Sequence, residues 1–136
     1  MTVRLNPYLS FGDNAREAME FYQTVFGGDL TITTFRELHA EVDDDELDSV
    51  MHSQLEAANG LVLMASDTPR HMGPYTPGGP ISLSLGGDDE PTLRGYWDGL
   101  SEGAVIRQAL EKAPWGDLFG MLTDRFGVAW MVSVSA

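Results

Sequence analysis

One short pattern of residues occurs twice in the chain and constrains its fold more than any other feature. Gly127–Ser133 reads GVAWMVS and resembles Gly60–Ser66, which reads GLVLMAS. Each copy follows a turn signal, Asn59-Gly60 in the first case and Asp124-Arg125-Phe126-Gly127 in the second. Glycine is the common residue where a turn needs a positive φ angle, and the alternating apolar residues around each turn predict a β-hairpin. The repetition predicts two similar modules, neither of which can close a core alone.

The first half shows one predicted helix among four predicted strands. Apolar residues at helical spacing predict a helix from Ala15 to Phe26, which Gly27-Gly28 ends. Asn14 and Glu17 have capping-box spacing, with Asp13 as the alternative cap. Alternation and β-branched residues predict strands at Val3–Phe11, Leu30–Phe35, Ser49–Ala57 and Leu61–Ser66. Residues 36–48 carry eight charged side chains and predict a surface excursion, either mobile or briefly helical.

The second half repeats this order after a stretch rich in proline and glycine. A strand is predicted at Pro80–Leu85, and a helix begins near Pro91 and ends before Gly103. Ala104–Ala109 predicts a strand, although its apolar residues also fit helical spacing. The closing hairpin has strands at Leu118–Thr123 and Val128–Val134. We therefore expect a single domain over residues 1–136, with module one at about 1–67, a linker at about 68–79 and module two at about 80–136.

The charge and composition of the chain exclude several classes of partner. The formal net charge is −13, from 21 acidic and 8 basic residues. Charge of this sign repels nucleic-acid phosphates and anionic lipid headgroups, so we expect no nucleic-acid and no membrane partner. The absence of cysteine rules out thiol nucleophiles and thiolate metal sites. Because the sequence shows neither a signal peptide nor a long apolar stretch, we expect a cytoplasmic protein.

Several motifs of the chain together resemble a known family. They are Asn6-Pro7-Tyr8-Leu9, Ala18-Met19-Glu20-Phe21-Tyr22, Leu63-Met64-Ala65-Ser66-Asp67, Trp115-Gly116-Asp117 and Asp124–Val128. Their order and spacing resemble the vicinal oxygen chelate superfamily of glyoxalase, bleomycin-resistance and dioxygenase proteins. Within it, the chain is most similar to the PhnB-like branch, labelled 3-demethylubiquinone-9 3-methyltransferase-like. The resemblance implies an α+β fold in which two βαβββ modules form cupped mixed sheets around a pocket, within a homodimer.

The resemblance also locates the positions at which metal-dependent relatives hold a divalent cation. The flanking motifs place these four positions at Asn6, Met64, Pro80 and Met131. A hard divalent cation prefers carboxylate or imidazole ligands, whereas proline offers no side-chain donor and thioether sulfur suits soft metals. We therefore expect neither a metal nor any other cofactor. We discount methyltransferase activity, because the chain lacks a glycine-rich strand–turn–helix that would hold a nucleoside cofactor.

Apolar side chains near the vacated metal positions predict a ligand pocket. Ligand pockets are mostly apolar with a few polar groups, which fits six residues, Asn6, Met64, Trp115, Phe119, Met121 and Met131. The alternative for the methionines is that they fill irregular space in the core. The leading hypothesis is metal-free binding of a small organic molecule, as in drug-sequestering resistance proteins of the superfamily.

Two residues are candidates for acid–base chemistry. His52 shares a strand face with Gln54 and Glu56, at a position where PhnB-like relatives often keep a histidine, and Asp67 ends the following strand. Histidine titrates near neutral pH and is a common general base. The alternative is that both residues are structural, with Asp67 accepting hydrogen bonds from turn amides. The second functional hypothesis is therefore a lyase, isomerase or oxygenase that uses His52 or Asp67 on a small metabolite.

Overall fold

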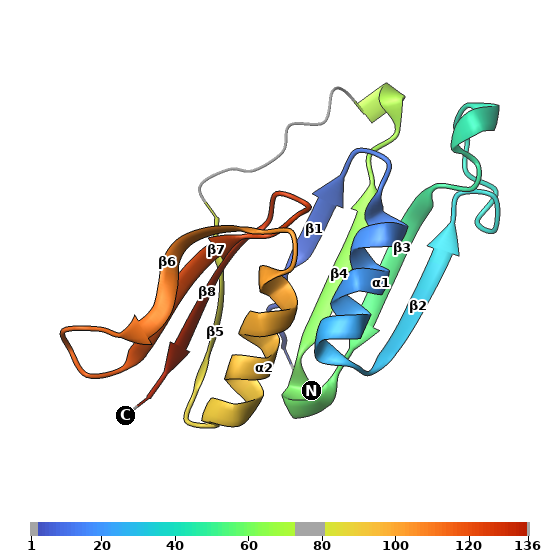
Figure 1. The fold of residues 1–136 in the computed structure, drawn as a ribbon. Helices are drawn as coiled ribbons and strands as arrows, with labels where there is room; N and C mark the ends of the chain where they lie inside the picture. The colour runs from blue at the N-terminus through green and yellow to red at the C-terminus, as the bar shows by residue number, and fades with distance from the viewer. Residues whose placement is uncertain (1–2, 73–80, 136) are drawn as a thin grey trace. The chain divides into compact units, whose positions relative to one another are not determined.

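The computed structural model describes residues 3–72 and 81–135, and divides the chain into two compact units, Met1–Thr76 and Pro77–Ala136. Both units have the order strand, helix, strand, strand, strand (Figure 1). The first unit contains β1 (Tyr8–Phe11), α1 (Ala15–Phe26), β2 (Asp29–Thr34), β3 (Val50–Glu56) and β4 (Val62–Asp67). The second contains β5 (Leu83–Gly87), α2 (Glu90–Ser101), β6 (Val105–Lys112), β7 (Leu118–Thr123) and β8 (Ala129–Val134). The predicted α+β plan of two βαβββ modules is confirmed, and their union in a single domain stays a prediction.

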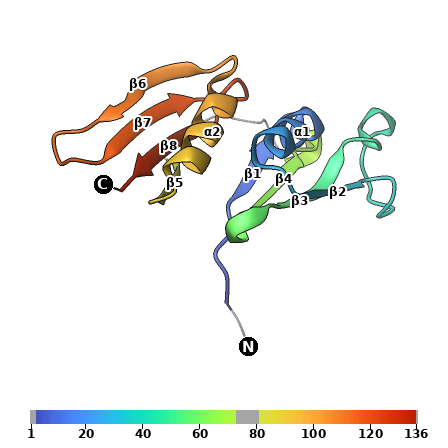
Figure 2. The ribbon, with the colours of Figure 1, turned by 60° about the horizontal axis from the view of Figure 1, so that its bottom comes forward.

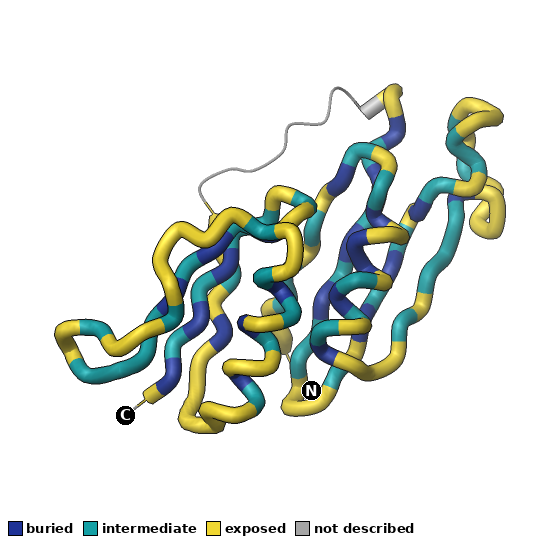
Figure 3. The backbone as a smooth tube through the Cα atoms, viewed as in Figure 1, coloured by how far each residue is buried: buried dark blue, intermediate teal, exposed yellow. Residues whose placement is uncertain are grey.

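The first unit is a mixed four-stranded sheet with one helix on it. The strand order is β1-β4-β3-β2, with β1 parallel to β4 and the other neighbours antiparallel. Alternate residues of β4 are buried, because successive side chains of a strand point to opposite faces. Helix α1 contributes one buried apolar stripe, consisting of Ala15, Ala18, Met19, Tyr22 and Phe26. The core of this unit therefore lies between α1 and one face of the sheet, where buried segments concentrate in Figure 3.

The second unit repeats this topology with strand order β5-β8-β7-β6, β5 being parallel to β8. Helix α2 buries Leu93, Trp97 and Leu100. Gly120 of β7 lies under this helix, and a Cβ atom added there would lie 2.7 Å from Cη2 of Trp97 and 3.0 Å from the Leu110 Cα. The missing side chain thus provides the space in which the indole ring packs on the sheet.

The two helices begin in different ways. Asp89 caps α2 by accepting a hydrogen bond from the Thr92 amide, a standard N-cap interaction. The predicted capping box of α1 is wrong, because Asn14 occupies the N-cap position without any side-chain cap hydrogen bond. The Ala15 amide instead donates to Oδ1 of Asp67 over 2.9 Å. The carboxylate that accepts a hydrogen bond from the first amide of this helix therefore belongs to the last residue of β4. The sequence around the start of the helix does not indicate this partner.

Several predicted boundaries differ from the structure because periodicity does not reveal strand partners. β1 begins at Tyr8 rather than Val3, and β5 begins at Leu83 rather than Pro80, which lies outside the described residues. β6 is a strand, not a helix, and runs to Lys112 because it pairs with β7 along its length. The charged excursion at 36–48 contains turns and a 3₁₀ turn at Asp44–Glu46, in keeping with its briefly helical alternative.

Candidate functional site

Each sheet has one face under its helix and an opposite face that carries no helix of the same unit, as Figures 1 and 2 show. We call this opposite side the open face. Since side chains alternate along a strand, the strand registers decide which residues share it. In the first sheet, the register pairs Met64 with both Tyr8 and Gln54, so all three lie on the open face. His52 lies two residues before Gln54 on β3 and therefore shares this face.

A polar pair spans the open face of the first sheet. The Tyr8 hydroxyl lies 3.3 Å from Nδ1 of His52, and the centroids of the two rings are 5.8 Å apart. Tyr8 belongs to β1 and His52 to β3, so the pair reaches across β4, the strand that carries Met64. One imidazole nitrogen is thereby engaged, and the other remains to donate or accept a proton. This pairing was not predicted, because 44 residues separate the partners.

The open face of the second sheet is more apolar. Met121 of β7 pairs directly with Met131 of β8, and Phe119 lies two residues from Met121 on the same face. The Trp115 ring meets Phe119 edge to face, with 5.5 Å between centroids, and 63% of the Trp115 residue is exposed. Four of the six predicted pocket residues therefore lie together on the second sheet, and Met64 lies on the open face of the first. Asn6 precedes β1 in an irregular segment and is half-buried.

The strand registers refine the predicted metal positions. Met64 pairs with Tyr8 and Met131 pairs with Ser84, so the two methionines occupy equivalent places in their sheets. Asn6 lies two residues before Tyr8, and the residue two before Ser84 is Ser82. Ser82 thus replaces Pro80 as the counterpart of Asn6. An amide, a hydroxyl and two thioethers offer no carboxylate or imidazole, so these side chains do not fit a hard divalent cation.

Asp67 lies on the helix-covered face and is 6% exposed. Its Oδ1 accepts from the Ala15 amide over 2.9 Å, and its Oδ2 accepts from the Val50 amide over 2.8 Å. The carboxylate thus joins the end of β4 to the start of α1 and the start of β3. Both of its oxygens bind backbone amides, which supports the structural alternative for this residue.

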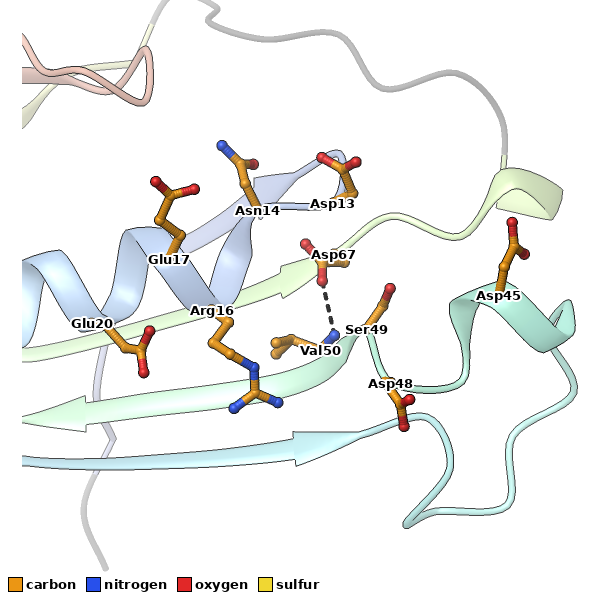
Figure 4. A pocket seen from close by; sticks show the side chains of 10 residues that line it. All are labelled: Asp13, Asn14, Arg16, Glu17, Glu20, Asp45, Asp48, Ser49, Val50 and Asp67. Carbon is orange, nitrogen blue, oxygen red and sulfur yellow. Dashed lines mark hydrogen bonds between the residues drawn. The ribbon is translucent and has the colours of Figure 1, made fainter.

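Asp67 also lines a hollow that the sequence did not predict. Its volume is about 560 Å³, and Figure 4 shows its walls. Acidic side chains dominate the lining, which comprises Asp13, Asn14, Arg16, Glu17, Glu20, Asp45, Asp48, Ser49, Val50 and Asp67. The run of aspartates at 43–48 was the only signal, and it gave no indication that the N-terminal end of α1 lies beside it. The hollow is distinct from both open faces.

An acidic cluster beside this hollow is neutralised by arginine. Asp43, Asp45 and Glu46 are the one set of three metal-type ligands found close together in residues 3–72 and 81–135. Nη2 of Arg70 lies 2.9 Å from Asp43 and 2.6 Å from Asp45, and the Arg70 amide donates to Glu46. Hydrogen bonding from Arg70 lowers the pKa of the Asp45 carboxyl below its ordinary value. The Arg70 guanidinium therefore supplies the positive charge that a metal ion would bring to these carboxylates.

Comparison with known sequences adds a family to this geometry. Residues 3–133 match the 3-demethylubiquinone-9 3-methyltransferase family. The chain belongs to this family. Its fold is similar to that of protein PA1353 from Pseudomonas aeruginosa, with 34% identity, a TM-score of 0.83 and 98% of each chain covered. It is also similar to the PhnB protein of Bacillus cereus, with 24% identity, a TM-score of 0.72, and 98% of this chain and 100% of that chain covered.

A more distant structure shares the fold. The glyoxylase/bleomycin resistance protein/dioxygenase domain from Frankia sp. EAN1pec shares 12% identity and a TM-score of 0.66, over 100% of this chain and 99% of that one. The resemblance to the PhnB-like branch and its glyoxalase/bleomycin-resistance fold is confirmed. The description of the family names a methyltransferase, but the two described sheets each contain one parallel strand pair and not the doubly wound sheet typical of nucleoside-cofactor sites. Neither described helix has the length and apolarity to cross a membrane.

Proposed function

We propose that the protein binds a small organic molecule, without a metal, through the open faces of its sheets. The observation that carries this proposal is the apolar group on the second sheet, where the Met121–Met131 pair adjoins Phe119 and Trp115. On the first sheet, considered by itself, Met64 and the nearby Asn6 are the proposed ligand contacts.

The chemistry of these side chains suits an organic ligand. Thioethers are polarisable and flexible, so methionines adapt to the shape of a ligand and make favourable contacts with aromatic rings. An indole that is 63% exposed costs free energy in water and contributes much apolar contact area when a ligand covers it. Binding sites for small molecules commonly combine an apolar surface with a few polar groups, and on the first sheet the strand with Met64 lies between the partners of the Tyr8–His52 pair.

A ligand screen by thermal shift tests this function. Ligands that bind the folded protein raise Tm, and Met131→Gln, which keeps the length of the side chain but adds a polar amide, is expected to reduce the shift produced by each hit. Met51→Gln is the matched control, because Met51 is 37% exposed on β3. Equal shifts in wild type and Met131→Gln would contradict a site at this methionine, and a broad screen without hits would contradict binding altogether.

A second candidate function follows from the contact between Tyr8 and His52. The 3.3 Å contact orients the imidazole on the open face, as a partner orients a general base in many enzymes. We propose His52 rather than Asp67 as the acid–base residue of such a lyase, isomerase or oxygenase, because the Asp67 oxygens accept hydrogen bonds from two backbone amides. If the protein is an enzyme, His52→Ala abolishes most of kcat, whereas in a pure binding protein the variant keeps its ligand affinity.

We also propose that the protein is a cytoplasmic homodimer. The PhnB-like resemblance supports this assembly. Light scattering during size-exclusion chromatography measures the mass directly, with twice the chain mass of 14.9 kDa expected. A mass equal to one chain at micromolar concentration would contradict the dimer.

A further inference from the structure

The strand β6 contains an irregularity that redirects one basic side chain. Ile106 pairs with Leu122 and Gln108 pairs with Met121, so the register shifts and Arg107 is the extra residue between them. Such a bulge changes the direction of the side chain that it adds, and bulges are frequent beside functional sites. In keeping with this, Nε of Arg107 donates to the Thr123 hydroxyl over 3.4 Å. Thr123 alternates with Met121 and Phe119, so the guanidinium lies on the open face of the second sheet.

The ionic environment of Arg107 differs from that of its neighbours. The second unit has four basic residues, of which Arg94 pairs with Glu90 at 2.9 Å and Arg125 with Glu102 at 4.0 Å. Lys112 pairs with Leu118 in the register, on the side of the sheet that α2 covers. Within the described part of this unit, Arg107 has no carboxylate within 4.0 Å. Among the described residues of the second unit, the Arg107 guanidinium on the open face therefore has no counter-ion.

The apolar row begins next to this cation. Thr123, Met121 and Phe119 follow one another on one face of β7, and at about 3.4 Å per residue the row extends roughly 14 Å. Glu111 pairs with Phe119 at the far end of the row, and its carboxylate accepts from the Gln108 side chain over 3.4 Å. The open face is therefore polarised, with a cation at the Thr123 end and an anion at the Phe119 end.

We propose that the open face of the second sheet binds an organic carboxylate, whose carboxylate group pairs with Arg107 and whose apolar body lies on Met121, Met131 and Phe119. This inference rests on the proposed binding function and names its ligand class. A planar guanidinium presents donors that match a carboxylate in two parallel hydrogen bonds, which gives orientation as well as affinity. Glu111 repels the same group at the other end of the row, so the ligand binds in one direction.

The experiment compares two probes of nearly the same shape, 2-naphthoate, which carries a charged carboxylate, and 2-naphthamide, in which a neutral amide replaces it. Their dissociation constants are measured by isothermal titration calorimetry in 0.15 M NaCl. At this ionic strength the Debye length is about 8 Å, so the long-range repulsion of the naphthoate by the net charge of −13 is largely screened. A charge-assisted hydrogen bond predicts that wild type binds the naphthoate about tenfold more tightly than the amide. Arg107→Gln is expected to remove this preference while it leaves the affinity for the amide within about twofold.

Two control variants separate a local effect from a change in net charge. Arg94→Gln removes the same charge from the exposed surface of α2 and is expected to keep the preference for the naphthoate. Glu111→Gln is expected to bind the naphthoate at least as well as wild type. Equal affinity of wild type for both probes, or equal weakening of both by Arg107→Gln, would overturn the assignment of Arg107 while the binding function stands. If neither probe binds, this inference fails, whereas the proposed binding function is refuted by a broad ligand screen without hits.

Discussion

Replacement of Asp67 by alanine is expected to destabilise the first unit strongly. The carboxylate accepts hydrogen bonds from the amides of Ala15 and Val50, two residues that are 0% and 1% exposed. Without an acceptor, each buried N–H group loses its partner at about 1–3 kcal/mol. The sum for the two groups is about 2–6 kcal/mol, and we expect about 4 kcal/mol for Asp67→Ala. Asp67→Asn keeps one carbonyl oxygen as an acceptor and should cost about half as much.

Urea unfolding followed by far-UV circular dichroism measures this loss. Asp13→Ala is the matched control, because Asp13 borders the same hollow, carries the same charge and is exposed. Amide hydrogen exchange adds a local measurement, in which the Ala15 and Val50 amides of Asp67→Asn should lose more protection than amides elsewhere in the first unit. A stability for Asp67→Ala within about 1 kcal/mol of Asp13→Ala would refute the structural role of the carboxylate.

Three further outcomes are expected. Gly120→Ala should lower the free energy of unfolding by about 1–3 kcal/mol, because the added methyl group meets the Trp97 indole ring of α2. Gly95→Ala, within α2 and with open space around it, should raise the free energy of unfolding by about 0.5–1 kcal/mol. Thermal unfolding measures both changes. Asp124→Ala, which removes the acceptor of a buried indole N–H and two turn amides, should cost about 2–4 kcal/mol and shift tryptophan emission to the red. Arg70 lowers the pKa of the Asp45 carboxyl, so this pair stabilises the fold at pH values above the unfolded pKa of the carboxyl. The contribution disappears as the pH falls through the lower pKa of the folded state. Arg70→Gln should therefore move the titration of the Asp45 carboxyl carbon, followed by NMR, to higher pH.

The repeated hairpins could be predicted from the sequence because local chemistry determines them. Asn59, Gly60 and Gly127 all adopt the positive φ angles that the turn signals indicated, at 63°, 73° and 86°. Alternation around the turns then predicted which residues share a face, so the equivalence of Met64 and Met131 followed from the repeated sequence pattern alone. Short-range signals were sufficient wherever the structure depends on short-range contacts.

The features that the sequence did not predict depend on contacts between distant residues. Asp67 accepts a hydrogen bond from the first residue of α1, which lies 52 positions earlier in the sequence, and the two partners of the Tyr8–His52 pair are 44 positions apart. The flanking motifs predicted Pro80 as the counterpart of Asn6, whereas the pairing of Ser84 with Met131, which matches that of Tyr8 with Met64, gives Ser82. The direction of Arg107 follows from a bulge that only the pairing of β6 with β7 reveals.

The most direct test of ligand binding on the open face uses the methyl groups of the seven methionines as NMR probes. Protein labelled with ¹³C at the methionine methyl groups is titrated with 2-naphthoate, and single substitutions assign the signals. Saturable shifts of the Met121 and Met131 methyl signals are expected, with the Met19 signal unchanged because that side chain is buried between α1 and the first sheet. Saturable binding that leaves Met121 and Met131 unshifted, or no binding at all, would contradict the account.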